Sequence, residues 1–289
     1  MNKYIELVDK KLEEYLPIKY PESIFKSMKY TVTLPGKRLR PVMCLEACRI
    51  MGGDIEKALP TACAIEMLHA QSLIHDDLPC MDNDDFRRGK PSNHKVFGEA
   101  IAVLAGDALI SFAPQLIIEK SELEPEKVIK VLHEYVSAAG AYQLIGGQVA
   151  DILSEQGEGK LNNSDEETLH FIHTNKTAVL FKLALKTGAI IAGADEKQIE
   201  EMDEFGQKFG LAFQIYDDIM DEISTFEEMG KTIGKDKEAG KLTYVSLYGL
   251  EKAKQKVREL ISDTTKTAQK YKSDIFTEMF NKILSKIED

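Results

Sequence analysis

Residues 73–94, which read LIHDDLPCMDNDDFRRGKPSNH, place acidic side chains directly after a mostly apolar segment at residues 62–74. Asp76, Asp77 and Asp82 lie within seven positions of one another. Two carboxylates about 5 Å apart repel each other by roughly 3 kcal/mol at an effective dielectric constant of about 20. Because the acids end a segment that is apolar enough to be buried, something must offset this repulsion. A divalent cation bound through oxygen atoms is the usual solution, so these residues predict a metal site.

The spacing within this acidic stretch predicts a loop. On a continuous helix Asp76 and Asp82 would point toward nearly opposite sides, because they are six positions apart. Pro79 lies between them and disfavours helical angles at Leu78. We therefore expect the helix to end near Leu78 and the loop to carry Asp82 back toward Asp76. An acidic loop in water is the alternative, whereas an EF-hand calcium loop fits less well because a third ligand and a glycine are missing.

Two groups of basic side chains flank the acids in the sequence. Arg87, Arg88 and Lys90 follow the acids almost at once. The earlier group stands just before a helix expected to begin at Pro41, and it consists of Lys37, Arg38 and Arg40. Such side chains bind anionic oxygens well, and a helix N-terminus adds to the attraction. Acids, metal and bases together predict a site for a metal-bound phosphate or diphosphate, with ordinary surface charge as the alternative for the earlier group.

A second acidic cluster lies far along the chain, in FQIYDDIMDE at residues 213–222. Asp217, Asp218 and Asp221 follow a segment rich in phenylalanine at residues 205–213. Asp217 and Asp221 are four positions apart, so a helix places them on one face. Two acid clusters at the ends of two apolar helices predict that the clusters face each other across a cavity. A helix end exposed to water is the alternative, but it would not explain why both clusters interrupt apolar segments.

With DDLPCMD at residues 76–82 and DDIMD at residues 217–221, the chain resembles the trans-prenyl diphosphate synthases, or polyprenyl synthetases, which include farnesyl and geranylgeranyl diphosphate synthases. The resemblance covers about residues 36–250. It implies one prenyl diphosphate synthase domain over residues 1–289, an all-α bundle of the isoprenoid synthase type around a central apolar cavity. Helical periodicity and the absence of alternating strand patterns independently predict an all-α fold. A homodimer is implied by the resemblance alone.

The resemblance also implies a reaction in isoprenoid biosynthesis, the condensation of isopentenyl diphosphate with dimethylallyl, geranyl or farnesyl diphosphate, with Mg²⁺ ions as cofactors. The metal ligands that it implies are Asp76, Asp82, Asp217 and Asp221. The other catalytic residues that it implies are Asp77, Asp218 and Lys176. The residues implied to surround the leaving diphosphate are Arg87, Lys176, Thr177, Gln214, Lys231 and Lys241. The residues implied to bind isopentenyl diphosphate are Lys37, Arg40, His69 and Arg88.

The cavity below Asp76 is expected to set the length of the product. Gln71 and Ser72 precede Asp76 by about one helical turn. Family members that stop at fifteen carbons often carry an aromatic side chain at the position of Gln71, so geranylgeranyl diphosphate is the expected product and farnesyl diphosphate the alternative. A terpene cyclase and a non-catalytic subunit of a heteromeric synthase are rival functions. The cyclase would not need a second diphosphate site, and the subunit would be expected to lack aspartates from one motif.

Composition argues against several other functions. The chain carries 37 Lys and Arg against 48 Asp and Glu, a net charge of −11, which disfavours nucleic acid and anionic membranes as partners. Residues 100–118 are apolar enough to raise the question of a membrane span. Asp107, Pro114 and Gln115 inside that segment favour a buried core helix instead. We expect no stable membrane insertion, a cytoplasmic location and reduced, buried cysteines.

The remaining predictions concern helices, one loop and three histidines. Helices are expected at residues 2–16, 41–51, 59–77, 100–118, 126–154, 164–186, 196–223 and 245–286. The fifth should break near Gly140 or Gly146, and Ser164 with Glu167 forms a capping box that begins the sixth. Residues 224–241 are rich in Gly and Lys and predict a mobile cationic flap. The histidines expected to be structural are His133, His170 and His173.

Overall fold

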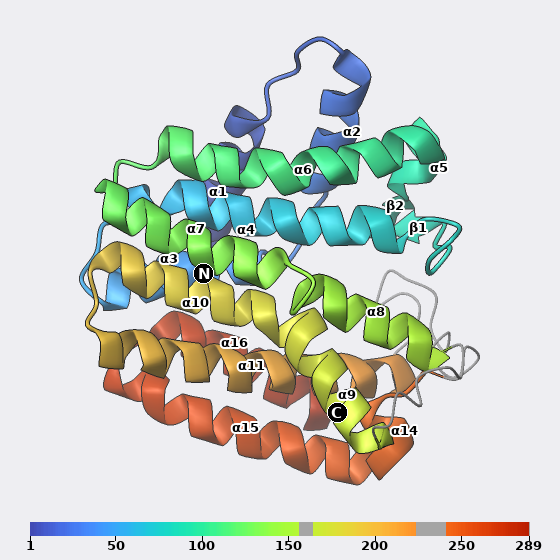
Figure 1. Ribbon diagram of the computed structural model, residues 1–289. Helices are drawn as coiled ribbons and strands as arrows, with labels where there is room; N and C mark the ends of the chain where they lie inside the picture. Colours follow the sequence, from blue (N-terminus) through green and yellow to red (C-terminus); the bar gives the residue numbers. More distant parts are fainter. Residues whose placement is uncertain (156–163, 224–240, 289) are drawn as a thin grey trace.

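Helices make up nearly all of the regular structure (Figure 1). The computed structural model describes residues 1–155, 164–223 and 241–288. Within these ranges the strands are β1 (Phe86–Arg87) and β2 (Lys90–Pro91), which pair antiparallel and contain two residues each. The prediction of an all-α fold is therefore confirmed. The segment expected to form a cationic flap, residues 224–241, lies outside the described residues except for its last member.

The helix boundaries agree with the expected ranges over much of the chain. In chain order the helices are α1 (Asn2–Tyr15), α2 (Glu22–Val32), α3 (Leu39–Ile50), α4 (Ile55–Asp76), α5 (Asn93–Phe97), α6 (Glu99–Lys120), α7 (Pro125–Ala139), α8 (Leu144–Glu155), α9 (Asp165–Ile172), the π-helical turn η1 (His173–Ala178), α10 (Val179–Ala192), α11 (Glu196–Ile223), α14 (Tyr244–Tyr248), α15 (Leu250–Lys270) and α16 (Asp274–Glu288). The predicted ranges did not include α2 and α5. The break expected within residues 126–154 falls at Gly140, which follows the last residue of α7.

Two predicted helices are divided in the structure. Residues 164–186 begin with the expected capping box, but the turn η1 separates α9 from α10. The prediction of one helix over residues 245–286 is wrong, because Gly249 takes a φ of 85° between α14 and α15. A second break follows α15, where the hydroxyl of Ser273 accepts a hydrogen bond from the N–H of Phe276 at 3.2 Å and so caps α16.

The interior of the bundle is built from α3, α4, α10 and α11. α10 packs against α3 and α11, and α4 packs against α3 and α6. α15 packs on α11 and lies at the lower edge of the view in Figure 1. Gly188 of α10 meets α3 so closely that a Cβ atom there would lie 2.3 Å from the carbonyl oxygen of Cys44. Glycine at this position therefore allows the backbones of α3 and α10 to approach.

α6 is buried on one side only. Its inner face includes Ala102, Leu109 and Ala113, which are fully buried, whereas Leu104 and Ile118 are 52% and 60% exposed. Among the residues that the structure describes, α6 is the one helix that is long and apolar enough to span a membrane by length and composition. The prediction of a buried core helix is therefore correct for one face of α6 and wrong for the other.

The cysteines are free thiols, and one of them is not buried. Cys44, Cys48 and Cys63 lie in the core, where burial raises the pKa of Cys44 to about 12. Cys80 is exposed, so the prediction of buried thiols is wrong at this position. The reason is local, because Pro79 and Cys80 form the outer part of the turn that follows α4.

Candidate active site

The first acidic motif follows the C-terminal end of α4. The helix ends at Asp76, and in the next turn the N–H of Leu78 donates to the carbonyl oxygen of His75 at 3.1 Å. The N–H of Asp82 donates to the carbonyl oxygen of Asp76 at 2.8 Å. The loop therefore folds back onto the helix end, as the position of Pro79 predicts, and brings the backbones of Asp76 and Asp82 together.

The carboxyl group of Asp76 is buried among other charges. Burial raises its pKa to about 7, Lys176 opposes this shift, and the negative charge of Asp82 adds to it. Asp151 holds Lys176 in turn, with 2.5 Å between Nζ and Oδ2. A buried carboxyl group beside a second one is a chemically suitable ligand for a hard cation, because the cation offsets the cost of burying negative charge.

A cavity, here called the first hollow, lies between α4, α6, α8 and η1 and has a volume of about 560 Å³. Its polar lining residues are Arg40, His69, Gln71, Ser72, His75, Asp76, Asp107, Gln148, Lys176 and Thr177. Its apolar lining residues are Leu73, Met81, Ile110, Leu144, Ile145, Val149, Ile152 and Leu180. Although polar residues outnumber apolar ones in this lining, most of the surface that faces the cavity is apolar.

A second cavity, here called the second hollow, adjoins the first and has a volume of about 410 Å³. Its lining residues are Pro35, Gly36, Lys37, Arg38, Leu39, Arg40, Glu66, His69, Leu73, Arg87, Arg88, Phe213 and Asp217. These include all four residues that the resemblance implies for isopentenyl diphosphate. Arg40, His69 and Leu73 border both hollows. Asp76 of the first motif and Asp217 of the second therefore open onto adjoining hollows.

Asp77 and Arg87 pair with each other. Asp77 is 1% exposed, and the Nε of Arg87 donates to its Oδ1 at 3.0 Å. The Nη2 of Arg87 contacts the same oxygen and lies 3.3 Å from Oδ2 of Asp84. Burial raises the pKa of Asp77 even though Arg87 opposes the shift. Arg87 lines the second hollow and not the first, but its charge still reaches Asp76 and opposes the rise in the pKa of that carboxyl group.

Arg40 is a buried guanidinium between the two hollows. Its Nε has no hydrogen-bond partner in the described part of the chain. Its guanidinium carbon lies 4.5 Å from the centre of the Phe181 ring, a cation–π contact. Burial lowers the pKa of Arg40 to about 10, a shift that Glu66 and Asp217 oppose. The group thus has donors in place for an anionic oxygen in either hollow.

Lys37 and His69 are two further members of the lining of the second hollow. The Nζ of Lys37 lies 5.8 Å from the centre of the Phe213 ring and 5.9 Å from that of the Tyr216 ring. Burial, followed by the positive charge of Arg40 and of other arginines, lowers the pKa of His69 well below its usual range. His69 is therefore neutral near pH 7 and acts as a hydrogen-bond partner rather than as a cation.

Glu66, which the sequence alone did not identify, holds two arginines of the second hollow. It is 2% exposed, and its Oε1 accepts a hydrogen bond from Nη1 of Arg38 at 2.6 Å. The Nη2 of Arg88 lies 3.6 Å from the same oxygen. Asp9 of α1 accepts a further bond from the Nε of Arg38 at 2.8 Å. The sequence feature that could have indicated Glu66 is a single acidic residue within an apolar helical segment, three positions before His69.

Asp151 and Gln148 of α8 are two further residues that were not predicted. Asp151 is the ion-pair partner of Lys176. Both amide atoms of Gln148, which lines the first hollow, are buried without a hydrogen-bond partner among the described residues. α8 can approach η1 because position 147 is glycine, and a Cβ at Gly147 would lie 2.4 Å from the backbone nitrogen of Lys176. The available signal was GGQVAD at residues 146–151, where the sequence indicated only a possible helix break.

The second motif lies near the end of α11. Asp217 lines the second hollow, and Asp221 follows one turn later on the same face of the helix. Asp218 is 6% exposed and accepts a hydrogen bond at Oδ1 from Nε2 of Gln214 at 2.9 Å. The Oε1 of Gln214 accepts one from the hydroxyl of Thr177 at 2.5 Å. The structure therefore joins Gln214 and Thr177 to the second motif, and Lys176 precedes Thr177 in the same turn.

Of the two further lysines that the resemblance implies around the leaving diphosphate, the structure describes Lys241. The Nζ of Lys241 lies 3.1 Å from Oε1 of Glu155 at the end of α8, and Lys241 does not line either hollow. Lys231 lies outside the described residues. The three histidines expected to be structural differ from one another in burial. His133 and His170 are exposed, whereas the side chain of His173 is buried, with 3% of its surface exposed.

The described residues do not form a complete metal cage. No group of three or more His, Cys, Asp or Glu side chains among them is placed to hold a metal ion. The donors of the two motifs are all carboxylate oxygens, which are the ligands that Mg²⁺ prefers. Mg²⁺ is commonly bound through one or two carboxylates together with substrate phosphates and water. The two motifs therefore fit Mg²⁺ chemically, with a phosphate-bearing substrate needed to complete its coordination.

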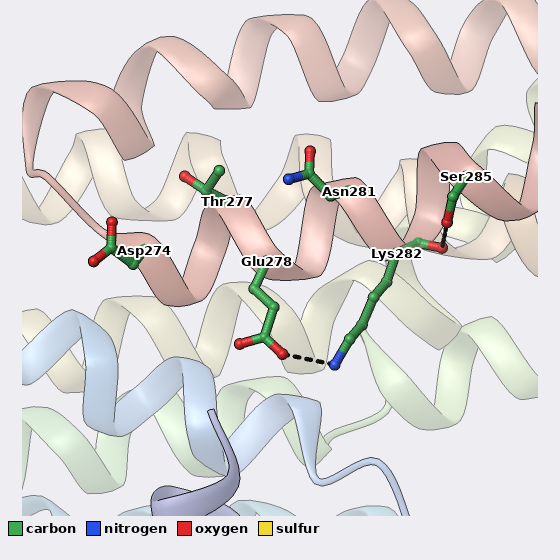
Figure 2. A pocket seen from close by; sticks show the side chains of 6 residues that line it. All are labelled: Asp274, Thr277, Glu278, Asn281, Lys282 and Ser285. Atoms are coloured by element: carbon green, nitrogen blue, oxygen red, sulfur yellow. Dashed lines mark hydrogen bonds and ion pairs between the residues drawn. The ribbon is translucent and has the colours of Figure 1, made fainter.

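A shallow depression along α16 differs in kind from the two hollows (Figure 2). It has a volume of about 510 Å³, and the residues that line it are Asp274, Thr277, Glu278, Asn281, Lys282 and Ser285. The Nζ of Lys282 donates to Oε1 of Glu278 at 2.8 Å, along the same helix. Pairs four positions apart on an exposed helix are an ordinary surface feature, so this depression is not a candidate active site.

The fold and the two hollows define a class of protein. An all-α bundle surrounds an aliphatic cavity and a cationic cavity, with carboxylate motifs from two distant helices at their walls. This arrangement suits an enzyme that acts on diphosphate esters of hydrocarbons, because it combines anion sites with a cavity whose surface is mostly apolar.

Comparison with known proteins identifies the family. The family model for polyprenyl synthetase matches residues 21–283. The chain is 47% identical over 262 residues to a dimethylallyltranstransferase of Fischerella ambigua (strain UTEX 1903), covering 90% of this chain and 75% of that protein. It is 48% identical over 256 residues to geranylgeranyl pyrophosphate synthase 7, chloroplastic, of Arabidopsis thaliana, covering 89% and 73%.

A solved structure is similar over nearly the whole chain. It is the geranyltransferase from Helicobacter pylori complexed with magnesium and isoprenyl diphosphate, with a TM-score of 0.85, 31% identity, and coverage of 99% of this chain and 95% of that one. The present chain therefore belongs to the polyprenyl synthetase family, and it is a prenyltransferase.

We expect the substitution Arg40→Gln to weaken the binding of inorganic diphosphate. The buried guanidinium between the hollows offers charge-assisted hydrogen bonds, each worth about 1.5–3 kcal/mol. The dissociation constant should therefore rise about tenfold or more. Isothermal titration calorimetry of the purified protein with inorganic diphosphate measures this constant directly.

Arg258→Gln is the matched control for this substitution, because Arg258 is exposed on α15 and does not line either hollow. This control should bind inorganic diphosphate as tightly as the unaltered protein. Unchanged binding in the Arg40→Gln protein would show that Arg40 takes no part in anion binding. An equal loss in both variants would show that binding reflects overall charge rather than the hollows.

Proposed function

We propose that this prenyltransferase joins isopentenyl diphosphate to an allylic diphosphate and that geranylgeranyl diphosphate is its main product. The observation that carries the proposal is the pair of adjoining hollows, one aliphatic with Asp76 at its wall and one lined by basic side chains. A reaction between two diphosphate esters needs two anion sites and a dry cavity for the growing chain. The shared border at Arg40 and His69 would bring the reacting ends of the two substrates together.

We infer Mg²⁺ as the cofactor, held by Asp76 and Asp82 on one side and by Asp217 and Asp221 on the other. The carboxylate donors support this inference, as does the presence of magnesium with isoprenyl diphosphate in the Helicobacter pylori geranyltransferase. When bound, the ions would draw negative charge from the leaving diphosphate and so lower the barrier to cleavage of its C–O bond.

Residues of the first hollow would act on the allylic substrate. Lys176 adds positive charge where the leaving diphosphate lies, and Asp151 keeps its Nζ in place. Aliphatic side chains such as Leu144 and Ile152 exclude water that would otherwise capture the allylic cation. The hydrocarbon tail of the substrate occupies the part of the cavity below Asp76.

Residues of the second hollow would orient isopentenyl diphosphate. Lys37, Arg40 and Arg88 bind its diphosphate, and neutral His69 forms a hydrogen bond to it. The C–O bond of the allylic diphosphate breaks first, and the double bond of isopentenyl diphosphate then attacks the allylic cation to form the new C–C bond. A proton then leaves to the released diphosphate, so the reaction requires no nucleophile or base from the protein.

Residues one turn below Asp76 would determine the product length. Gln71 is 8% exposed, lines the first hollow, and has its Nε2 3.1 Å from Nδ1 of His75. The hydroxyl of Ser72 donates to the carbonyl oxygen of His69 at 2.9 Å. None of the described residues that line this hollow is Phe, Tyr or Trp. The absence of these bulky aromatic side chains from the described lining supports a twenty-carbon product over farnesyl diphosphate.

We infer that the enzyme works as a homodimer in which a second copy covers the outer faces of α6 and α7. These helices pack on each other, and the exposed apolar side chains on them include Leu104, Ile118, Ile129 and Val136. Apolar side chains that gather on an exposed surface favour burial against a partner. Both aspartate motifs are complete in this chain, which argues against the alternative of a non-catalytic subunit.

We expect the release of diphosphate to depend on both substrates. Purified protein with Mg²⁺ and dimethylallyl diphosphate should release diphosphate only when isopentenyl diphosphate is added, and chromatography should then show geranylgeranyl diphosphate as the main product. A mixture with a chelator of divalent cations is the control and should release none. Release from geranyl or farnesyl diphosphate without isopentenyl diphosphate would indicate a cyclase, and exclusive formation of farnesyl diphosphate would refute the proposed product length.

We expect Gln71→Tyr to shorten the product, because an aromatic ring would fill the cavity one turn below Asp76. Chromatography of the products should show a larger share of farnesyl diphosphate. Gln255→Tyr, on the exposed side of α15, is the matched control and should leave the distribution unchanged. If the Gln71→Tyr protein gives the original distribution, residue 71 does not limit chain growth.

A further inference from the structure

Asp218, the second aspartate of the second motif, does not belong to the lining of either hollow. It is 6% exposed, whereas its neighbour Asp217 lines the second hollow. Successive side chains on an α-helix point about 100° apart, so adjacent residues face different surroundings. One aspartate of the pair therefore faces the space where substrate would bind, and the other faces the interior of the protein.

Both carboxylate oxygens of Asp218 have partners, and Oδ2 contacts groups from two other elements of the fold. Its Oδ1 accepts a hydrogen bond from Nε2 of Gln214 at 2.9 Å. Its Oδ2 accepts one from the backbone N–H of Tyr244 at 2.8 Å, and Nε2 of His173 lies 3.4 Å from the same oxygen. These groups belong to α11, to the start of α14 and to the start of η1. Asp218 therefore connects three elements of the structure.

Two of these contacts lead to η1, the turn that carries Lys176 and Thr177 to the first hollow. His173 is the first residue of this turn. Gln214 of the same helix as Asp218 contacts this turn nearer its end, because its Oε1 accepts a hydrogen bond from the hydroxyl of Thr177 at 2.5 Å. π-helical turns within helices are uncommon and occur frequently at functional sites. Asp218 thus contacts the beginning of η1 directly, at His173, and is linked to the end of η1 through Gln214 and Thr177.

We propose that Asp218 is a positioning residue and not a metal ligand. It fixes η1 so that Lys176 and Thr177 face the leaving diphosphate, and it ties the start of α14 to the second motif. To bind a metal ion it would have to give up hydrogen bonds in a region with little access to water. The proposal rests on the proposed function, and it differs from the catalytic role beside the metal that the resemblance implies for Asp218.

Calorimetric titration of Mg²⁺ into the protein saturated with inorganic diphosphate, alongside the Mg²⁺ dependence of activity, separates the two roles. The Asp218→Asn protein should bind Mg²⁺ as tightly as the unaltered protein. Asp218→Asn removes one acceptor oxygen and should lower kcat about tenfold or more, while the Mg²⁺ concentration for half-maximal activity stays unchanged. Asp221→Asn is the matched control within the same motif and should raise that Mg²⁺ concentration. A rise in the Asp218→Asn protein as large as that in the control would overturn the proposal, and so would an unchanged kcat.

A double-mutant cycle tests whether Asp218 acts through η1. The double variant Asp218→Asn, Thr177→Val should have a kcat close to that of the more impaired single variant, because both substitutions break the same chain of contacts. Two losses that multiply would indicate independent or merely structural roles and would contradict the proposal. Failure of the proposed function would look different, because the unaltered protein would then form no condensation product.

Gln214→Leu provides a second variant in case the Asp218→Asn protein does not fold. It removes the link between Asp218 and Thr177 and leaves the carboxylate and its contact with Tyr244 in place. We expect it to lower kcat at an unchanged Mg²⁺ requirement. An unchanged kcat in this variant, like a raised Mg²⁺ requirement, would rule out positioning through this link.

Discussion

Charged groups inside an apolar helical bundle must be balanced, and this constraint organises the centre of the molecule. Burying an unpaired ion costs several kcal/mol, so most of the buried charges are paired. The pairs are Glu66 with Arg38, Asp77 with Arg87, and Asp151 with Lys176. Mainly through burial, the pKa of Asp76 is raised to about 7 and the pKa of Arg40 is lowered to about 10. These two groups mark places where a metal-bound diphosphate would supply the missing balance.

Local sequence signals predicted those parts of the fold that depend on neighbouring residues. The range of α11 was predicted correctly because an apolar period ends in an acidic motif, and Pro79 indicated the end of α4 to within two residues. The division of residues 245–286 was not predicted, because a single glycine or serine in a helical pattern does not reveal a backbone turn. Gly249 and Ser273 end and begin helices only through their φ angle and their capping bond.

Local sequence patterns predicted residues of the candidate site only at the two acidic motifs and at the basic groups that flank the first of them. The aspartates of the two motifs were found from their spacing, whereas Glu66 and Asp151 contact partners 28 and 25 positions away, and such distances leave no local pattern. Asp218 shows the limit of motif reading in another way. The resemblance implied a catalytic role for Asp218, but its contact with the N–H of Tyr244 depends on how α11 and α14 pack.

If the enzyme works as proposed, both aspartate motifs hold one metal-bound diphosphate between them. A crystal structure with Mn²⁺ and an unreactive thio analogue of dimethylallyl diphosphate would test this most directly, because anomalous scattering locates the ions. We predict ions at Asp76 and Asp82 and at Asp217, all bound to oxygens of the same diphosphate. Ions confined to one motif, or a diphosphate bound away from Asp217, would contradict this arrangement.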